Sequence, residues 1–275
     1  MAMLERSKTA PLTVLMGHKL SYGGLLPVLE HLSRIKSLTI DNLRADKMNE
    51  MHAFIQHNSS VAPQLEVLSI SCYWSRDWRM PSTAFQQTDR LHDLSLKQVS
   101  IKWSDSPLLR NLTKLRIQLS NHPPTWRELL TALNQMPTLK SLFLSETFPE
   151  VPFNDARDAV VARLPNLENL VLRSVPNIDG VMAFMTQVKL PPDLKVFTIV
   201  DIGDGPSSEE FRELYHTINR SLPRLGSKVR YMNIARVSLS DTFGHTFIEC
   251  SSTLRNKFHE WWHSADLRQT RRTLR

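Results

Sequence analysis

Hydrophobic residues recur along the chain in a short fixed pattern, in which positions one, four and six of a segment are apolar and the positions between them are mostly polar. Eight segments carry this motif, and successive segments start 21 to 35 residues apart. Their apolar positions are Ile35-Leu38-Ile40, Leu65-Leu68-Ile70, Leu91-Leu94-Leu96, Leu112-Leu115-Ile117, Leu139-Leu142-Leu144, Leu167-Leu170-Leu172, Leu194-Phe197-Ile199 and Val229-Met232-Ile234. Because side chains alternate along an extended chain, positions four and six share a face, and each segment predicts a strand with one buried face.

The spacing of the motif is typical of the L-x-x-L-x-L core of a leucine-rich repeat, whose period is about 20–29 residues. Four segments, such as "MPTLKSLFL" and "LPNLENLVL", also have a proline two residues before the first apolar position. A proline there stops a preceding helix and favours an extended chain after it. The alternative to a repeat is a set of unrelated amphipathic elements that match the motif by chance.

Helical signals lie between several of these strands. "TWRELLTALNQM" starts with a capping box, Thr125 with Glu128, and has apolar residues at helical spacing. "SSEEFRELYHTINRSL" repeats this arrangement with Ser207 and Glu210, and "DGVMAFMTQV" offers Asp179 as its cap. The shortest connection contains "KWSDSPLLRN" and has room only for an irregular or 3-10 segment.

Strands and helices that alternate at a regular period predict an α/β leucine-rich-repeat solenoid. We expect a curved parallel sheet of about eight strands on the concave face, with helices and irregular segments on the convex face. No linker divides the chain, which predicts one domain over residues 1–275. Residues 1–34 form its N-terminal start, 35–239 the repeats, and 240–275 a C-terminal capping helix with a basic tail.

The residues that flank the apolar pair of each strand are expected to point to the concave face. In the middle strands they bring Lys97, Lys114, Arg116 and Arg173 together around Phe143. Arginine and aromatic residues are enriched in the hot spots of protein interfaces. The sequence therefore predicts a protein-binding patch that prefers an acidic partner. The alternative is a solvated face without a partner.

The N-terminal phrase "ERSKTAPLTV" is followed by "LLPVLEHLSRIKSLTI" and by the irregular repeats. The match to a known family is carried by Glu5, Arg6, Ser7, Ala10, Pro11 and Leu12. In these features the chain resembles the leucine-rich-repeat F-box proteins of mushroom-forming fungi (Agaricomycetes).

The resemblance implies the substrate-recognition subunit of a cullin-RING ubiquitin ligase, in which the F-box binds a linker protein and the repeats hold the substrate. The helical F-box module that precedes this phrase in the family is missing from the sequence. Binding of the linker protein is thus expected only if an F-box lies upstream. The alternative is a stand-alone interaction scaffold with no ubiquitin role.

Composition argues against a membrane protein, a secreted protein and a nucleic-acid-binding protein. The longest apolar runs fall short of the roughly 18–20 residues that span a bilayer, and the N-terminus has no apolar signal segment. Two cysteines, Cys72 and Cys250, form no metal framework and suggest a reducing compartment, so we expect a cytoplasmic or nuclear protein. Of the net charge of +7, residues 254–275 carry +4. A basic tail of this kind is usually solvated, and a nucleic-acid partner is not expected.

One string suggests an enzyme. His259-Glu260-Trp261-Trp262-His263 fits H-E-x-x-H, the zinc-binding helix of many metalloproteases. A catalytic zinc needs a third protein ligand, and the sequence marks none. Trp261 and Trp262 instead lie on an apolar helical stripe, for which we expect a capping role. No phosphate-binding or nucleophile-elbow motif occurs, so we expect no enzyme, metal or cofactor, with a zinc peptidase as the remote alternative.

Overall fold

The computed structural model describes residues 6–17, 25–57, 61–72, 78–104, 106–149, 153, 160–192, 194–202, 208–221, 231–237 and 245–250. All structural statements below concern these residues.

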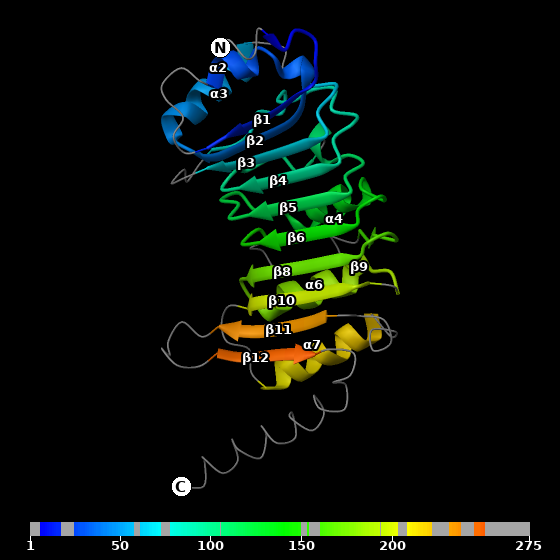
Figure 1. Ribbon diagram of the computed structural model, residues 1–275. Helices are drawn as coiled ribbons and strands as arrows, with labels where there is room; N and C mark the ends of the chain where they lie inside the picture. The colour runs from blue at the N-terminus through cyan, green and yellow to red at the C-terminus, as the bar shows by residue number, and fades with distance from the viewer. Residues whose placement is uncertain are drawn as a thin grey trace.

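Most of the described strands belong to one sheet. The strands are β1 Leu12–Met16, β2 Ile35–Leu43, β3 Val67–Cys72, β4 Asp93–Lys97, β5 Lys114–Gln118, β6 Ser141–Ser145, β7 Ala162–Arg163, β8 Asn169–Val175, β9 Val188–Lys189, β10 Val196–Ile202, β11 Tyr231–Val237 and β12 His245–Cys250. Ten of them form the sheet in the order β1-β2-β3-β4-β5-β6-β8-β10-β11-β12, while β7 pairs with β9 (Figure 1). Pairing is parallel from β1 to β11 and antiparallel between β11 and β12.

Helices and short 3-10 turns fill the connections. The described helices are α2 Leu25–Leu29, α3 Ala45–His57, α4 Trp126–Asn134, α6 Ile178–Gln187 and α7 Ser208–Ser221, and the 3-10 turns are Leu32–Arg34 and Pro107–Leu109. Figure 1 shows α4 and α6 behind the sheet. The chain is therefore an α/β protein whose parallel strands are joined by crossover connections, as parallel pairing requires.

The eight strands predicted from the motif are confirmed, because β2 to β6, β8, β10 and β11 each contain the apolar pair of one motif. Two further strands of the sheet were not predicted. β1 extends the sheet within residues 1–34, and β12 lies within residues 240–275, where a capping helix was expected. Only seven residues join β11 to β12, too few for a parallel crossover, so the pair is antiparallel. The predicted helix around Trp261 lies outside the described residues.

From β3 to β11 the strands pair in an unshifted register that places each motif position beside the same position of the next repeat, whereas the β1–β2 and β2–β3 pairs each contain a shift. Leu94 pairs with Leu115, which pairs with Leu142, and Leu142 pairs with Leu170. The second apolar position forms an equivalent row. Both rows are buried from β2 to β10. A fully buried leucine contributes about 1.5–3 kcal/mol, so the two rows contribute strongly to the stability of the fold.

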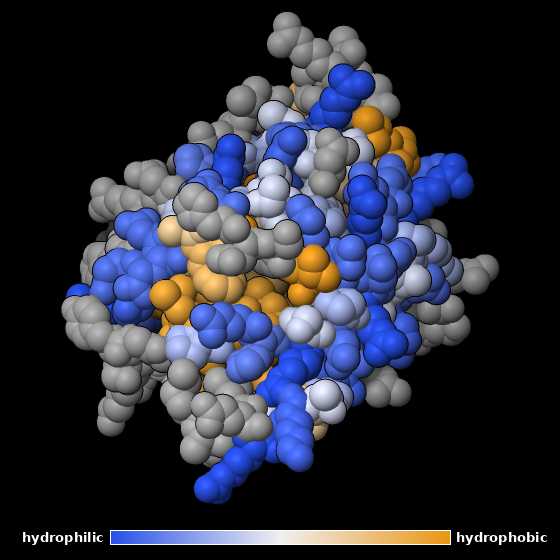
Figure 2. All heavy atoms as spheres, turned by 90° about the horizontal axis from the view of Figure 1, so that it is seen from above, coloured by the Kyte–Doolittle hydropathy of each residue, from blue (hydrophilic) through white to orange (hydrophobic). Residues whose placement is uncertain are grey.

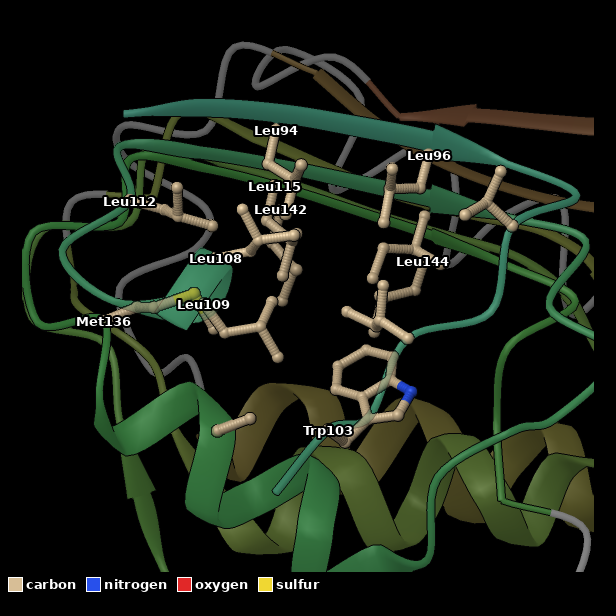
Figure 3. Packing of buried hydrophobic residues seen from close by; sticks show 14 of the residues in the cluster. Leu94, Leu96, Trp103, Leu108, Leu109, Leu112, Leu115, Met136, Leu142 and Leu144 are labelled. Carbon is tan, nitrogen blue, oxygen red and sulfur yellow. The ribbon is translucent and has the colours of Figure 1, made fainter. Parts of the chain in front are cut away.

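Figure 3 shows how these rows meet the opposite layer. Apolar side chains of the strands point into the core in two columns, and apolar side chains of the connecting segments pack against them. Trp103, Leu108, Leu109 and Met136 lie on that side, and Leu112 lies just before β5; all five are at most 3% exposed. Leu108 and Leu109 come from the 3-10 turn that the short connection predicted. The turn thus fills the place that a helix occupies in a longer repeat.

A repeated backbone conformation marks the end of the motif. Five non-glycine residues at motif position eight have φ between 49° and 57°, namely Asn42, Gln98, Leu119, Glu146 and Ser174. The left-handed region costs an ordinary residue roughly 1–2 kcal/mol. It recurs at one motif position, directly after β4, β5 and β6 and at the last residue but one of β2 and β8.

The helix caps agree with the sequence at one site and differ at another. The Thr125 hydroxyl accepts a hydrogen bond from the Glu128 amide at 3.2 Å, and the Thr125 amide donates to Glu128 Oε2 at 2.9 Å, so the capping box of α4 is confirmed. The prediction of Asp179 as a cap is wrong. Asn177 caps α6 by accepting from the Gly180 amide at 2.8 Å, because the buried Ile178 already belongs to the first turn. Ser207 lies outside the described residues.

Charged residues line the sheet where its strands begin, at motif position two. Lys36 Nζ lies 3.3 Å from Glu66 Oε2, and Lys195 Nζ donates a hydrogen bond to Glu168. This hydrogen bond, aided by the charges of Lys195 and Lys140, lowers the pKa of Glu168. Because the folded-state pKa is lowered, the pair stabilises the fold above the unfolded pKa, and this contribution is lost as the pH falls through the folded value.

We expect Lys195→Met to raise the pKa of Glu168 towards its ordinary value, since the hydrogen bond from Lys195 is its largest cause. NMR titration of the Glu168 carboxyl carbon measures this directly. Lys36→Met removes a similar lysine from a distant strand pair and serves as the control. An unchanged Glu168 titration in the Lys195 variant would contradict the assigned pairing.

Candidate functional site

The candidate site lies on the face of the sheet that carries motif positions three, five and seven, here called the open face. These side chains are partly or fully exposed along β4, β5 and most of β6 and β8, whereas positions four and six are buried. The alternation follows from the period of two in a strand. The open face therefore offers side chains from several strands to a partner, and its chemistry is set by three residues per repeat.

All five residues predicted for the binding patch lie on this face. Lys97 ends β4, Lys114 and Arg116 lie in β5, Phe143 lies in β6 and Arg173 lies in β8. These four strands are neighbours in the sheet. The four cationic side chains are exposed and Phe143 is partly buried. The structure thus brings together residues that are up to 76 positions apart in the sequence.

The centre of the site is a contact between Arg116 and Phe143. The two residues pair directly in the register of β5 and β6. The guanidinium carbon of Arg116 lies 4.4 Å from the centroid of the Phe143 ring. A cation–π contact of this kind contributes about 0.5–1 kcal/mol at an exposed site. The Phe143 ring holds the guanidinium close to the open face of the sheet. The N–H groups of the guanidinium can still bind a carboxylate in a bidentate manner.

Lys114 has a different environment from Arg116. Its Nζ lies 3.2 Å from Asp93 Oδ2, and the two residues pair in the register of β4 and β5. Asp93 offsets the charge of Lys114 on the open face. Of the four cationic residues of the patch, Lys114 therefore adds least to the attraction of an acidic partner. Asp93 flanks the apolar pair of its motif, which predicts this face for it, but its pairing with Lys114 was not predicted. The equivalent motif positions of Asp93 and Lys114 were the signal for it.

Lys97 and Arg173 lie in the row formed by motif position seven, with Gln118 and Ser145 between them. Three strand spacings of about 4.8 Å separate them by roughly 14 Å. Lys97 is a diagonal neighbour of Arg116, whereas Arg173 lies on the other side of Phe143. No ion pair joins Lys97 to a carboxylate within the described part of the chain.

Two residues beside the predicted patch extend its apolar part. Val171 pairs with Phe143 and also with Thr198, and Val196 lies on the next strand, β10. Both valines are partly exposed. The patch prediction did not include them. Their motif positions, five and three, were the signal that they face solvent.

A further exposed apolar residue lies at the N-terminal end of the sheet. Leu15 in β1 is 74% exposed and pairs with Thr39, so it belongs to the open face. Leu26 in α2 is 37% exposed. Figure 2 looks down on this end and shows apolar atoms surrounded by polar ones. Sequence reasoning missed Leu15, because β1 lacks the motif.

The described residues gather few groups of the kind used in catalysis. Within the described residues, no cluster of three or more His, Cys, Asp or Glu side chains could hold a metal ion. Burial raises the pKa of the Cys72 thiol to about 12, so this thiol stays protonated at neutral pH. His259, Glu260 and His263 lie outside the described residues. None of the described helices is both long enough and apolar enough to cross a membrane.

No protein-family model, curated protein or solved structure matches the chain.

Proposed function

We propose that the chain is a leucine-rich-repeat solenoid that acts as a non-catalytic protein-binding module. Its open face binds an acidic segment of a partner protein through Arg116, Phe143 and the cations around them. The contact of Arg116 with Phe143 carries this proposal, because it fixes an exposed guanidinium beside an apolar ring on a broad surface.

The solenoid part of the proposal is supported by the repetition of one motif, one register and one left-handed backbone position along the sheet. Strands lie about 4.8 Å apart, whereas helices need about 8–10 Å between their axes. Where helices fill the outer layer, that layer needs more length per repeat than the sheet. This mismatch favours a curved sheet with the open face on its concave side.

The ligase role is supported by the resemblance to F-box proteins. In that role the chain is the substrate-recognition region of a ubiquitin-ligase adaptor, in the cytoplasm or nucleus. Co-purification with the ligase linker protein tests it. Linker protein recovered with the chain, or with a longer product of the same gene, supports the adaptor role. A partner captured by the open face in the absence of the linker protein supports a stand-alone scaffold.

We expect the triple variant Arg116→Ala, Phe143→Ala, Arg173→Ala to bind its partner at least roughly 30-fold more weakly. A hot spot costs about 2 kcal/mol or more when truncated, and each 1.4 kcal/mol is a factor of ten. The partner is first identified by cross-linking mass spectrometry with the unmodified chain. Its dissociation constant is then measured by calorimetry with both proteins.

The control for this experiment is Arg127→Ala with Arg163→Ala, which removes two exposed arginines from α4 and β7, outside the open face. This variant is expected to bind as the unmodified chain does. Equal affinity of the triple variant and the unmodified chain would contradict the proposed function.

A further inference from the structure

The chemistry of the open face changes along the sheet. Over β4 and β5 it is cationic, with Lys97 and Arg116 exposed as diagonal neighbours. Over β6, β8 and β10 a line of partly exposed apolar side chains, Phe143, Val171 and Val196, crosses successive strands, with Arg173 beside it on β8. A complementary ligand therefore has an acidic end followed by an apolar stretch.

The backbone of these strands has no hydrogen-bonding groups to spare. Strands β5, β6 and β8 are interior strands, each paired on both sides. An extended peptide gains affinity mainly when its main chain adds to a sheet edge, and this part of the open face has no edge. A helix satisfies its own main-chain hydrogen bonds and binds through side chains alone. The site therefore favours a helical ligand over an extended one.

We propose that the partner presents an amphipathic helix that lies across β4 to β10. Its acidic first turn contacts Lys97 and Arg116, and its apolar stripe covers Phe143, Val171 and Val196. This inference rests on the proposed function and adds the form of the ligand to it. Carboxylates in a first turn are also favoured by the helix dipole, which fixes the direction of the helix across the sheet.

The dimensions of the sheet fix the spacing in such a helix. Val171 lies two strands from Arg116, or roughly 10 Å, and Val196 lies three strands and one row away, or roughly 16 Å. With a rise of 1.5 Å per residue, these separations correspond to about seven and eleven helical positions. A helix with an acidic residue at Arg116 and aliphatic residues about 7 and 11 positions later reaches Val171 and Val196. These positions share one helix face.

A displayed peptide library tests this inference. The probe is a library of 18-residue peptides, randomised at every position, selected on the purified chain and counter-selected on Lys97→Ala, Arg116→Ala. We expect enriched peptides to have Asp or Glu in the first turn, aliphatic residues at the stated spacing and no internal proline. Enriched sequences without the acidic turn, or with internal prolines that require an extended chain, would overturn it, and so would a library without enrichment.

Matched synthetic peptides give the second measurement. One enriched peptide and its Glu→Gln counterpart are compared by fluorescence anisotropy on the unmodified chain, on Val171→Ser, Val196→Ser and on the control Thr39→Ala, Ser69→Ala. We expect at least a tenfold loss for the Gln peptide and for the valine variant, and no loss for the control. Equal affinities of the Glu and Gln peptides overturn the inference.

The two proposals fail in different ways. If the natural partner depends on Arg116, Phe143 and Arg173 but the selected peptides are extended, the helical ligand is wrong and the binding function stands. If the natural partner binds the triple variant normally, the proposed function itself is wrong.

Discussion

Replacing Leu142 by aspartate is expected to prevent folding at 25 °C. Leu142 is fully buried in the middle of the apolar row, between Leu115 and Leu170. A carboxylate there loses its hydration without gaining a partner, which costs several kcal/mol even after protonation. Since domains of this size are stable by about 5–15 kcal/mol, one such change removes most of the stability. Circular dichroism and soluble expression measure the outcome.

The matched control is Ser141→Asp, one residue earlier in the same strand. Ser141 faces the open side and is partly exposed. The change is expected to shift the unfolding free energy by at most about 0.5 kcal/mol, as surface changes usually do. Comparable losses in both variants would contradict the assignment of the two sheet faces.

The second large effect is expected for Phe148→Ala. Phe148 is 2% exposed and lies between α4 and α6, with its ring centroid 6.3 Å from that of Trp126 and 6.0 Å from that of Phe184. Both contacts are edge-to-face. Truncation of a buried phenylalanine costs about 3–5 kcal/mol through lost burial and the cavity left behind. Urea unfolding followed by tryptophan fluorescence measures the loss.

Phe153→Ala is the comparison for this variant. Phe153 also packs edge-to-face on Trp126, at 5.9 Å, but it is only partly buried. We expect its loss to be clearly smaller, because less apolar area returns to water. An effect of Phe148→Ala below 1 kcal/mol, or below that of Phe153→Ala, would show that Phe148 does not join the helices as described.

Much of the sheet could be predicted from the sequence, because the apolar pair of each motif determines both the strand and its buried face. Leu94 and Leu96, for example, share one face of the chain when it is extended, with the polar Ser95 on the other. The capping box at Thr125 and the 3-10 turn before Leu112 were predictable for similar local reasons. In each case the signal lies within a few residues.

The parts that were missed depend on the neighbouring structure. β1 is a strand because it pairs with β2, although its own sequence lacks the motif. β12 is antiparallel because its connection is short. Asn177 and Asp179 are both good capping residues, and the burial of Ile178 decides between them. None of these outcomes is set by the local pattern alone.

The residues of the candidate site could be placed on one face from the sequence, but their contacts could not. The motif positions put Lys97, Lys114, Arg116, Phe143 and Arg173 on the open face. The register pairs Lys114 with Asp93, whose carboxylate offsets the charge of Lys114. It pairs Arg116 with Phe143, whose ring leaves the charge of Arg116 in place. Register depends on the packing of whole repeats, so these contacts required the structure.

Site-specific photo-cross-linking tests the central claim most directly, namely that the open face binds a protein partner. A photoreactive phenylalanine analogue is placed at Phe143, and in separate variants at Val171 and at Arg127 on α4. The account predicts adducts with one partner protein from positions 143 and 171 and none from 127. Adducts from position 127 alone, or from none of the three, would contradict it.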